Sequence, residues 1–312
     1  MLDVELFYIV GVGRSGTTLL MSMLNAHPEI GTPPETHFVT SHISGRRPVS
    51  IAECREVLSA DQRLDRLGLD FDDVFRSGHR DEAKLSMETV YFRILSRWKE
   101  RHGVRLVGDK APRYVEFLPL LKSIAPRAKV IHMIRDPREV FLSRTRAAWS
   151  AGRREWTHLL AYTVQYSVGR ADGAKLFGDN YYEVLYEHLI SRPEEELKRL
   201  CTFLGVAYDS SMLQFSSSAA EIIAEDEWAW KSEAAGPLLK KNTEKWRSQL
   251  SQRQVARIET ACRKPFTDGL YERSGLTPRS MDLVMAFFVS STAVLYRALR
   301  QLKMFWRLRR SS

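Results

Sequence analysis

The stretch LFYIVGVGRSGTTLLMSMLNA, residues 6–26, decides the fold of this chain. Residues 6–10 form a short apolar run rich in β-forming residues, which predicts a buried strand. A glycine-rich loop follows. Residues 17–26 then carry leucine and methionine at helical spacing, which predicts a helix that His27-Pro28 ends. A strand, a glycine loop and a helix in this order are the setting of a phosphate-binding loop.

The loop itself nearly matches the pattern G-x-x-x-x-G-K-[ST]. Gly11, Gly16 and Thr18 are in register, but Thr17 replaces the lysine. Glycines and the N–H groups at the start of a helix still suit a phosphate, and Arg14 supplies a cation as a planar fork. Because the lysine that reaches a β,γ-phosphate pair is missing, the loop favours a ligand with a single 5′-phosphate.

Strands and helices alternate along the rest of the chain. Apolar runs predict strands over 104–108, 129–134 and 181–185, and helices are expected over 112–123, from 137 to about 149, and over 193–204. This alternation predicts an α/β fold, a P-loop-type parallel β-sheet flanked by helices on both faces. We expect one domain over residues 1–280, with a helical insertion on the substrate side at about 40–103 and an apolar, basic helical tail at 281–312.

Composition limits the classes of partner and compartment. The chain has 312 residues and a net charge of +9, which favours anionic partners such as nucleotides, anionic glycans, nucleic acid or a membrane surface. Cys54, Cys201 and Cys262 are far apart, so neither a metal site nor a disulfide framework is predicted. The first residues lack the basic segment and cleavage site of a signal peptide, and a cytoplasmic location is therefore expected.

Two longer motifs resemble one enzyme family. RSGTTLL at 14–20 resembles the 5′-phosphosulfate loop of sulfotransferases that use 3′-phosphoadenosine 5′-phosphosulfate (PAPS). Its continuation LNAHPEIGTPPETHF, 24–38, is especially similar to tyrosylprotein sulfotransferases and the bacterial enzymes related to them. KVIHMIRDPREVFLSR, 129–144, resembles the family's 3′-phosphate site, a strand that ends in Arg-Asp with a serine eight residues after the arginine. The resemblance covers about residues 5–275.

This resemblance implies transfer of a sulfuryl group from PAPS to an acceptor hydroxyl, with release of 3′,5′-adenosine bisphosphate (PAP) and no metal. Glu35 matches the family's general base, and Lys110 in GDKAPRY matches the lysine that faces the sulfuryl group, where Arg14 also stabilises negative charge. The residues that match cofactor-binding positions are Arg14, Ser15, Gly16, Thr17, Thr18, Leu19, Arg135, Ser143 and Tyr186, together with Lys240 or Lys241 in a late basic loop that ends in Lys-Trp.

Several alternatives stay open at this point. His37 is a second candidate for the base, whereas His27 is interpreted as a structural residue at a helix end. The acceptor is a carbohydrate, a lipid, a small metabolite or a peptide tyrosine. A P-loop kinase is disfavoured by the missing lysine and by the lack of an obvious strand-end aspartate for Mg²⁺. A non-catalytic basic adaptor is allowed by the charge, but no aromatic-basic motif outside the tail predicts a nucleic-acid partner.

The tail has three interpretations. Its apolar run from Leu283 to Tyr296 is short for a membrane-spanning helix, which needs about twenty residues. The tail is therefore a helix of the core or of a homodimer, an interfacial helix that makes the protein peripheral at the membrane, or a transmembrane anchor.

Overall fold

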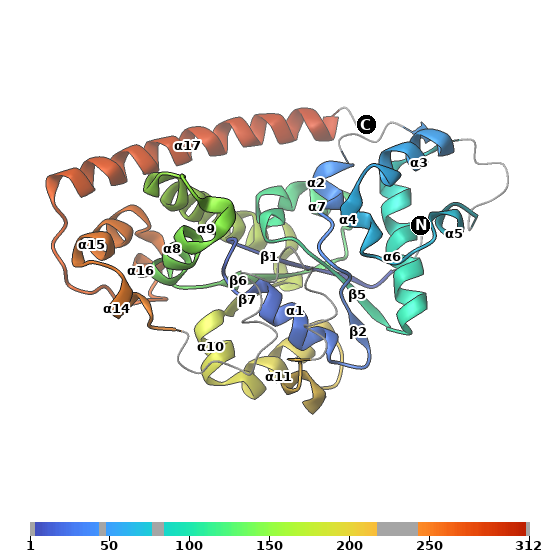
Figure 1. Ribbon diagram of the computed structural model, residues 1–312, viewed down its shortest axis with the longest axis horizontal. Coiled ribbons are helices and arrows are strands. Elements are labelled where there is room, and N and C mark those ends of the chain that lie inside the picture. The colour runs from blue at the N-terminus through green and yellow to red at the C-terminus, as the bar shows by residue number, and fades with distance from the viewer. Residues whose placement is uncertain (1–3, 44–47, 77–83, 217–242, 310–312) are drawn as a thin grey trace.

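The computed structural model describes residues 4–43, 48–76, 84–216 and 243–309 (Figure 1). Its centre is a five-stranded parallel sheet in the order β2-β5-β1-β6-β7. The strands are β1 (Leu6–Gly11), β2 (Ile30–Gly31), β5 (Leu106–Lys110), β6 (Lys129–Ile134) and β7 (Tyr181–Leu185). The predicted fold class is confirmed. β1 is the central strand, and the strands that follow it in the chain lie on both of its sides. In such folds ligands bind at the carboxyl ends of the strands, next to the strand where the order changes direction.

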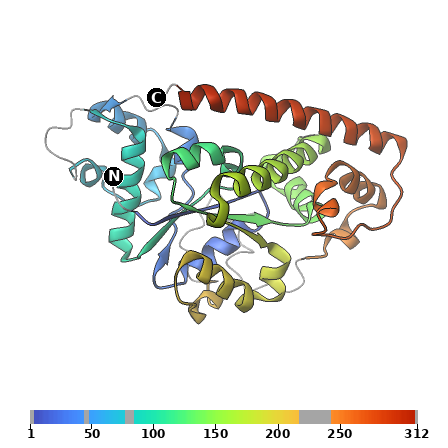
Figure 2. The same ribbon diagram turned by 180° about the vertical axis from the view of Figure 1, so that it is seen from behind.

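Helices cover both faces of the sheet (Figures 1 and 2). Phe7 and Ile9 pack on one face with α1 (Thr17–Asn25), α10 (Tyr186–Ser191) and α11 (Pro193–Leu204). Tyr8 and Val10 pack on the other face with the 3₁₀-helix η1 (Pro112–Phe117) and α7 (Leu118–Ile124), beside the long α9 (Glu155–Phe177). Strands buried on both faces need continuous apolar runs, and β1 has one.

Smaller elements complete the described chain. The inserted region contains the antiparallel pair β3 (Val49–Ser50) and β4 (Lys84–Leu85), and its apolar side chains join the same cluster as Tyr8. The remaining helices are α2 (Phe38–Ser41), α3 (Ile51–Ser59), α4 (Gln62–Asp65), α5 (Phe71–Arg76), α6 (Met87–His102), α8 (Pro137–Arg146), η2 (Ala148–Ser150), η3 (Gly178–Asn180), η4 (Ser210–Leu213), α14 (Trp246–Gln249), α15 (Gln252–Ala261) and α16 (Lys264–Thr267).

Two predicted elements have different bounds in the structure. The strand expected over 104–108 runs from Leu106 to Lys110, because the Asp109 carboxylate accepts a bond from the Tyr91 hydroxyl and Lys110 pairs with Glu35. These partners allow two charged residues to continue a buried strand. The helix expected over 112–123 begins as the 3₁₀-helix η1, and the one expected to reach about residue 149 ends at Arg146.

The tail forms α17 (Ser280–Arg309), which lies along one edge of the molecule over α9 and α15 (Figures 1 and 2). Its own residues Ala286, Val289 and Ala293 are buried against the rest of the protein. The Arg257 guanidinium lies 3.0 Å from the Asp282 carboxylate, and the buried Arg300 side chain lies 3.0 Å from Asp172. One face of the tail is thus part of the protein body.

Two adjacent positions on α17 test which face is buried. Ala293 is buried against Val164 and Val168 of α9, whereas the neighbouring Val294 side chain is exposed. We predict that Ala293→Leu lowers the free energy of unfolding by about 1–3 kcal/mol through overpacking. Val294→Leu should change it by less than about 0.5 kcal/mol. Denaturant unfolding of both variants measures the difference, and equal effects would contradict the packing of α17.

Candidate active site

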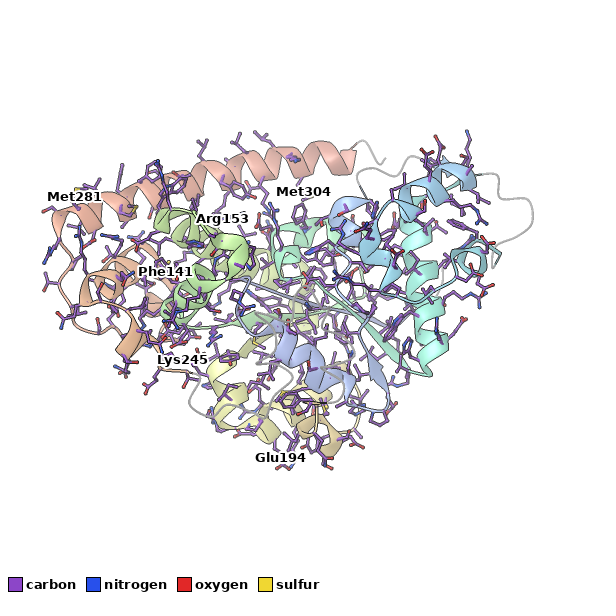
Figure 3. The ribbon with its side chains drawn as sticks, viewed as in Figure 1. Phe141, Arg153, Glu194, Lys245, Met281 and Met304 are labelled. Carbon is purple, nitrogen blue, oxygen red and sulfur yellow. The ribbon has the colours of Figure 1, made fainter. Side chains whose placement is uncertain are left out.

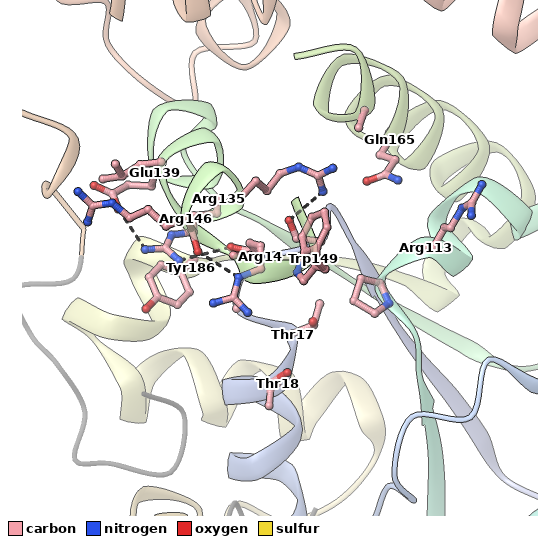
Figure 4. Close-up of a pocket in the computed structure, with 18 of the residues that line it drawn as sticks. Arg14, Thr17, Thr18, Arg113, Arg135, Glu139, Arg146, Trp149, Gln165 and Tyr186 are labelled. Carbon is pink, nitrogen blue, oxygen red and sulfur yellow. Dashed lines mark hydrogen bonds and ion pairs between the residues drawn. The ribbon is translucent and has the colours of Figure 1, made fainter. Parts of the chain in front are cut away.

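A pocket of about 930 Å³ opens at the carboxyl ends of the strands (Figure 4). Residues that line it come from the glycine loop, α1, α8, α9, η1 and the beginning of α10. In Figure 4, Arg135, Glu139, Arg146 and Tyr186 lie on one side, and Arg113 and Gln165 on the other, with the glycine loop between them.

The backbone of the glycine loop needs its glycines. Gly16 has φ +99°, and a Cβ atom there would lie 2.3 Å from a ring carbon of Tyr186. Arg14 also has a positive φ of 81°, which is uncommon for a residue with a side chain. Gly16 precedes α1 without a side-chain cap, and Thr17 and Thr18 line the pocket. The N–H groups of a first helical turn have no partner within the helix, so a turn in this position can bind an anion.

The two sequence motifs meet beside this loop. The Arg14 Nε donates to the Ser143 hydroxyl of α8 at 3.0 Å. The Arg135 guanidinium stacks on the Tyr186 ring, 4.0 Å from its centroid, and lies 3.2 Å from the Glu139 carboxylate. Side chains separated by more than a hundred residues therefore form one wall of the pocket, which Figure 4 shows to the left of the loop.

Glu35 lies in the pocket between two basic groups. The Lys110 ammonium donates to its Oε2, and the His37 Nε2 lies 3.0 Å from its Oε1. Glu35 and His37 line the pocket, but the Lys110 side chain is only 1% exposed and lies behind Glu35. His37 has a positive φ of 56°, a conformation that is costly for a side-chain residue and concentrates at functional sites.

The other residues predicted from the sequence do not all line the pocket. Leu19 lines the pocket, whereas the Ser15 side chain is fully buried and lies outside the lining. His27 is also buried outside the lining, with its Nε2 2.7 Å from the carbonyl oxygen of Ala207, as expected of a structural residue. Lys240 and Lys241 lie outside the described residues. Lys245, which follows them closely in the sequence, lines the pocket.

The pocket also contains cations that sequence analysis missed. Arg144, Arg146 and Arg153 line it beside Trp149, in an arginine-rich run that directly follows Ser143. Burial, together with the nearby positive charges of Arg153 and Arg14, lowers the pKa of Arg144 to about 10. Repulsion between the buried Arg144 and the cations near it is unfavourable until an anion enters the pocket. The arginine-rich run was the available signal, but charge runs are usually solvated and carry little information alone.

A polar group forms the opposite wall. The Gln165 amide of α9 donates to Glu116 at 2.7 Å, and the Tyr296 hydroxyl of α17 donates to the same carboxylate. Arg113 lies 3.6 Å from Glu116. All four of these residues line the pocket. The helix α17 therefore contributes to the wall opposite Arg135 and Tyr186.

The fold is an α/β fold with a parallel sheet, and its glycine loop lies in a pocket lined by several arginine side chains. The model of the sulfotransferase family matches residues 7–210. The chain belongs to the sulfotransferase family.

The match with this chain covers different shares of the length of its curated relatives. A putative protein-tyrosine sulfotransferase of Caenorhabditis briggsae is 24% identical over 88% of this chain and 91% of its own length. Nodulation protein NoeE of Sinorhizobium fredii is 26% identical over 67% of this chain, and protein-tyrosine sulfotransferase 2 of Gallus gallus is 28% identical over 68%. The chain spans about half the length of these last two, 51% and 54%.

The fold is also found among solved structures. The sulfotransferase domain of the Synechococcus PCC 7002 olefin synthase is 20% identical, with a TM-score of 0.59 over 92% of this chain and 95% of that domain. At this identity the similarity concerns the fold alone.

Asp109 gives this region a testable pH dependence. Burial raises the pKa of its carboxyl from 3.8 to about 6, although the Tyr91 hydroxyl donates to it at 2.8 Å. Folding thus favours the neutral acid, and the stability this contributes is present below pH 4 and lost as the pH rises through about 6. The free energy of unfolding of the wild type should fall by up to about 3 kcal/mol over this range relative to Asp109→Asn.

Denaturant unfolding across this pH range measures the slope. Asp179→Asn, at an exposed aspartate in η3, is the matched control and should keep the wild-type slope. An identical slope in wild type and Asp109→Asn would show that Asp109 does not carry this dependence.

Proposed function

We propose that this chain transfers a sulfuryl group from PAPS to the hydroxyl of an acceptor. The observation that carries the proposal is the convergence of Arg14, Ser143, Arg135 and Tyr186 around the uncapped start of α1. A phosphate loop without its lysine suits a 5′-phosphosulfate better than a triphosphate. Membership of the sulfotransferase family supports the same donor.

The residues on the Arg135 side suit the nucleotide of PAPS. The N–H groups of the α1 first turn, with the Thr17 and Thr18 hydroxyls, would bind the 5′-phosphate. Arg135 and Ser143 would bind the 3′-phosphate by charge-assisted and neutral hydrogen bonds. Lys245 is the described candidate for the late basic residue. Bound PAPS supplies the activated sulfuryl group, and the chain's own residues position it.

Arg14 and the loop N–H groups would stabilise the negative charge that grows on the departing 5′-phosphate. The other cations that line the pocket would add to this stabilisation. Within the described part of the chain, no cluster of three or more His, Cys, Asp or Glu side chains could hold a metal ion.

Glu35 is our proposed general base. Its carboxylate reaches the pocket, and Lys110 and His37 hold one oxygen each, which orients it for a hydroxyl proton. The buried position of Lys110 behind Glu35 makes it a positioning residue for the base in addition to its proposed role toward the sulfuryl group. His37 is the alternative base, since it also lines the pocket.

The acceptor is proposed at the level of a hydroxyl group only. The named relatives include protein-tyrosine sulfotransferases and a nodulation protein, so peptide tyrosine, carbohydrate, lipid and small-metabolite acceptors all need to be tested. The wall formed by Arg113, Glu116, Gln165 and Tyr296 is where we place acceptor recognition.

PAP binding tests the donor site. PAP at a hundred times its dissociation constant should stabilise the wild type by about 2.7 kcal/mol in a thermal-shift titration without metal. Arg135→Ala should remove most of this shift, because a 3′-phosphate ligand is lost. Arg199→Ala, at an exposed arginine of α11, is the control and should keep it. Stabilisation by Mg-ATP but not by PAP would overturn the proposed donor.

Substitution of the base should separate binding from turnover. Glu35→Gln should keep the PAP-induced thermal shift and lower transfer by about a hundredfold or more, because the amide cannot take a proton. Transfer is measured with sulfur-labelled PAPS and a panel of hydroxyl acceptors. His37→Gln is the comparison. A large loss in His37→Gln with an active Glu35→Gln would assign the base to His37.

A further inference from the structure

The distribution of polar and apolar side chains on α17 is the reverse of that on an ordinary surface helix. Its polar anchors point into the protein, where Asp282 pairs with Arg257, Arg300 pairs with Asp172, and the Tyr296 hydroxyl bonds to Glu116. Two of the buried side chains between these anchors are alanines, Ala286 and Ala293. A surface helix normally buries its large apolar residues and exposes its polar ones.

The outer face of α17 is apolar. Figure 3 shows side chains standing away from the body along this helix between Met281 and Met304. Among the described residues, the large apolar side chains exposed elsewhere are Val57, Trp149 and Leu213. Those exposed on α17 are Met281, Leu283, Val284, Phe287, Phe288, Val294, Leu295, Tyr296, Leu299 and Leu302, and Phe287 is 75% exposed. A contiguous apolar surface of this kind marks an interaction site.

The charge around this face selects the kind of partner. From Leu283 to Ser312 the sequence contains no acidic residue. After Tyr296 it contains six basic residues, Arg297, Arg300, Lys303, Arg307, Arg309 and Arg310. Arg300 points inward to Asp172, while Lys303 is exposed beside the apolar face. An apolar helix face next to cations complements a bilayer that contains anionic lipids.

We propose that the outer face of α17 binds the surface of an anionic lipid bilayer, with the helix axis in the plane of the membrane. By length and composition the segment Ser280–Met304 could cross a bilayer. Crossing would break the Arg257–Asp282 and Arg300–Asp172 ion pairs and expose Val289, which is fully buried. The inward anchors therefore favour a helix that lies on the membrane.

A second copy of the chain fits this face less well. In a two-fold dimer the same patch occurs on both sides of the interface. Each α17 would then bring its cations to a helix that has no acidic residue beyond Asp282, which is already paired. Anionic lipid head groups supply the missing negative charge.

Membrane binding would also place the pocket at the bilayer. Tyr296 belongs to α17 and lines the pocket, and its hydroxyl holds Glu116 in the wall opposite Arg135. The wall that we assign to the acceptor would then lie beside the lipid surface.

Co-sedimentation of the full chain with lipid vesicles tests the proposal directly. The wild type should bind vesicles that contain phosphatidylglycerol at least about tenfold more tightly than vesicles of phosphatidylcholine alone, and added salt should weaken binding. The double variant Phe287→Ser, Val294→Ser should lose about tenfold or more in affinity for the anionic vesicles, because two side chains no longer enter the interface.

The matched control is Val57→Ser, Leu213→Ser, which removes two exposed apolar side chains from other elements. It should bind vesicles like the wild type, and circular dichroism melting should show that both double variants remain folded. Equal vesicle binding by all three proteins, or no binding by the wild type, would overturn the proposal. A wild-type dimer in analytical ultracentrifugation that dissociates in Phe287→Ser, Val294→Ser, without vesicle binding, would assign the face to a subunit interface.

Discussion

Parallel pairing of the central strand β1 with β5 and β6 is the constraint on which the site depends. Because parallel strands end at the same edge of the sheet, residues that follow different strands meet there. The glycine loop follows β1, Lys110 ends β5, Arg135 follows β6 and Tyr186 follows β7. Glu35 reaches the same edge soon after β2. The fold thus brings Glu35, our proposed base, together with the glycine loop, Lys110 and Arg135 from separate parts of the chain.

The pocket is stabilised locally but carries an excess of positive charge. Gly16 and Tyr186 fit together so closely that a side chain at residue 16 would overlap the ring, which fixes the loop against α10. Arg144 is buried close enough to Arg14 and Arg153 for its pKa to be lowered. Such an arrangement is unfavourable in an empty pocket and favourable once an anion is bound, which is the expected compromise of an anion-binding site.

Different helices form the proposed nucleotide side and the proposed acceptor side of the pocket. On the nucleotide side, rigid contacts join α1, α8 and α10 through Arg14, Ser143 and Tyr186. On the acceptor side, η1, α9 and α17 meet through Glu116. The helix that completes the acceptor wall also presents an apolar, acid-free outer face. The proposed acceptor wall and the proposed membrane-binding face therefore share the helix α17.

The sequence by itself determined the order strand, glycine loop and helix, the strands at 129–134 and 181–185, and the occurrence of Arg135 and Ser143 in one motif. These are local patterns, and adjacent residues suffice to specify them. Only the tertiary structure decided that Lys110 lies behind Glu35, that Arg144 lines the pocket, and that α17 buries Ala286 and exposes Phe287. Each of these depends on contacts between residues distant in the chain. A helix that is apolar nearly all round carries no periodic signal to show which face is buried.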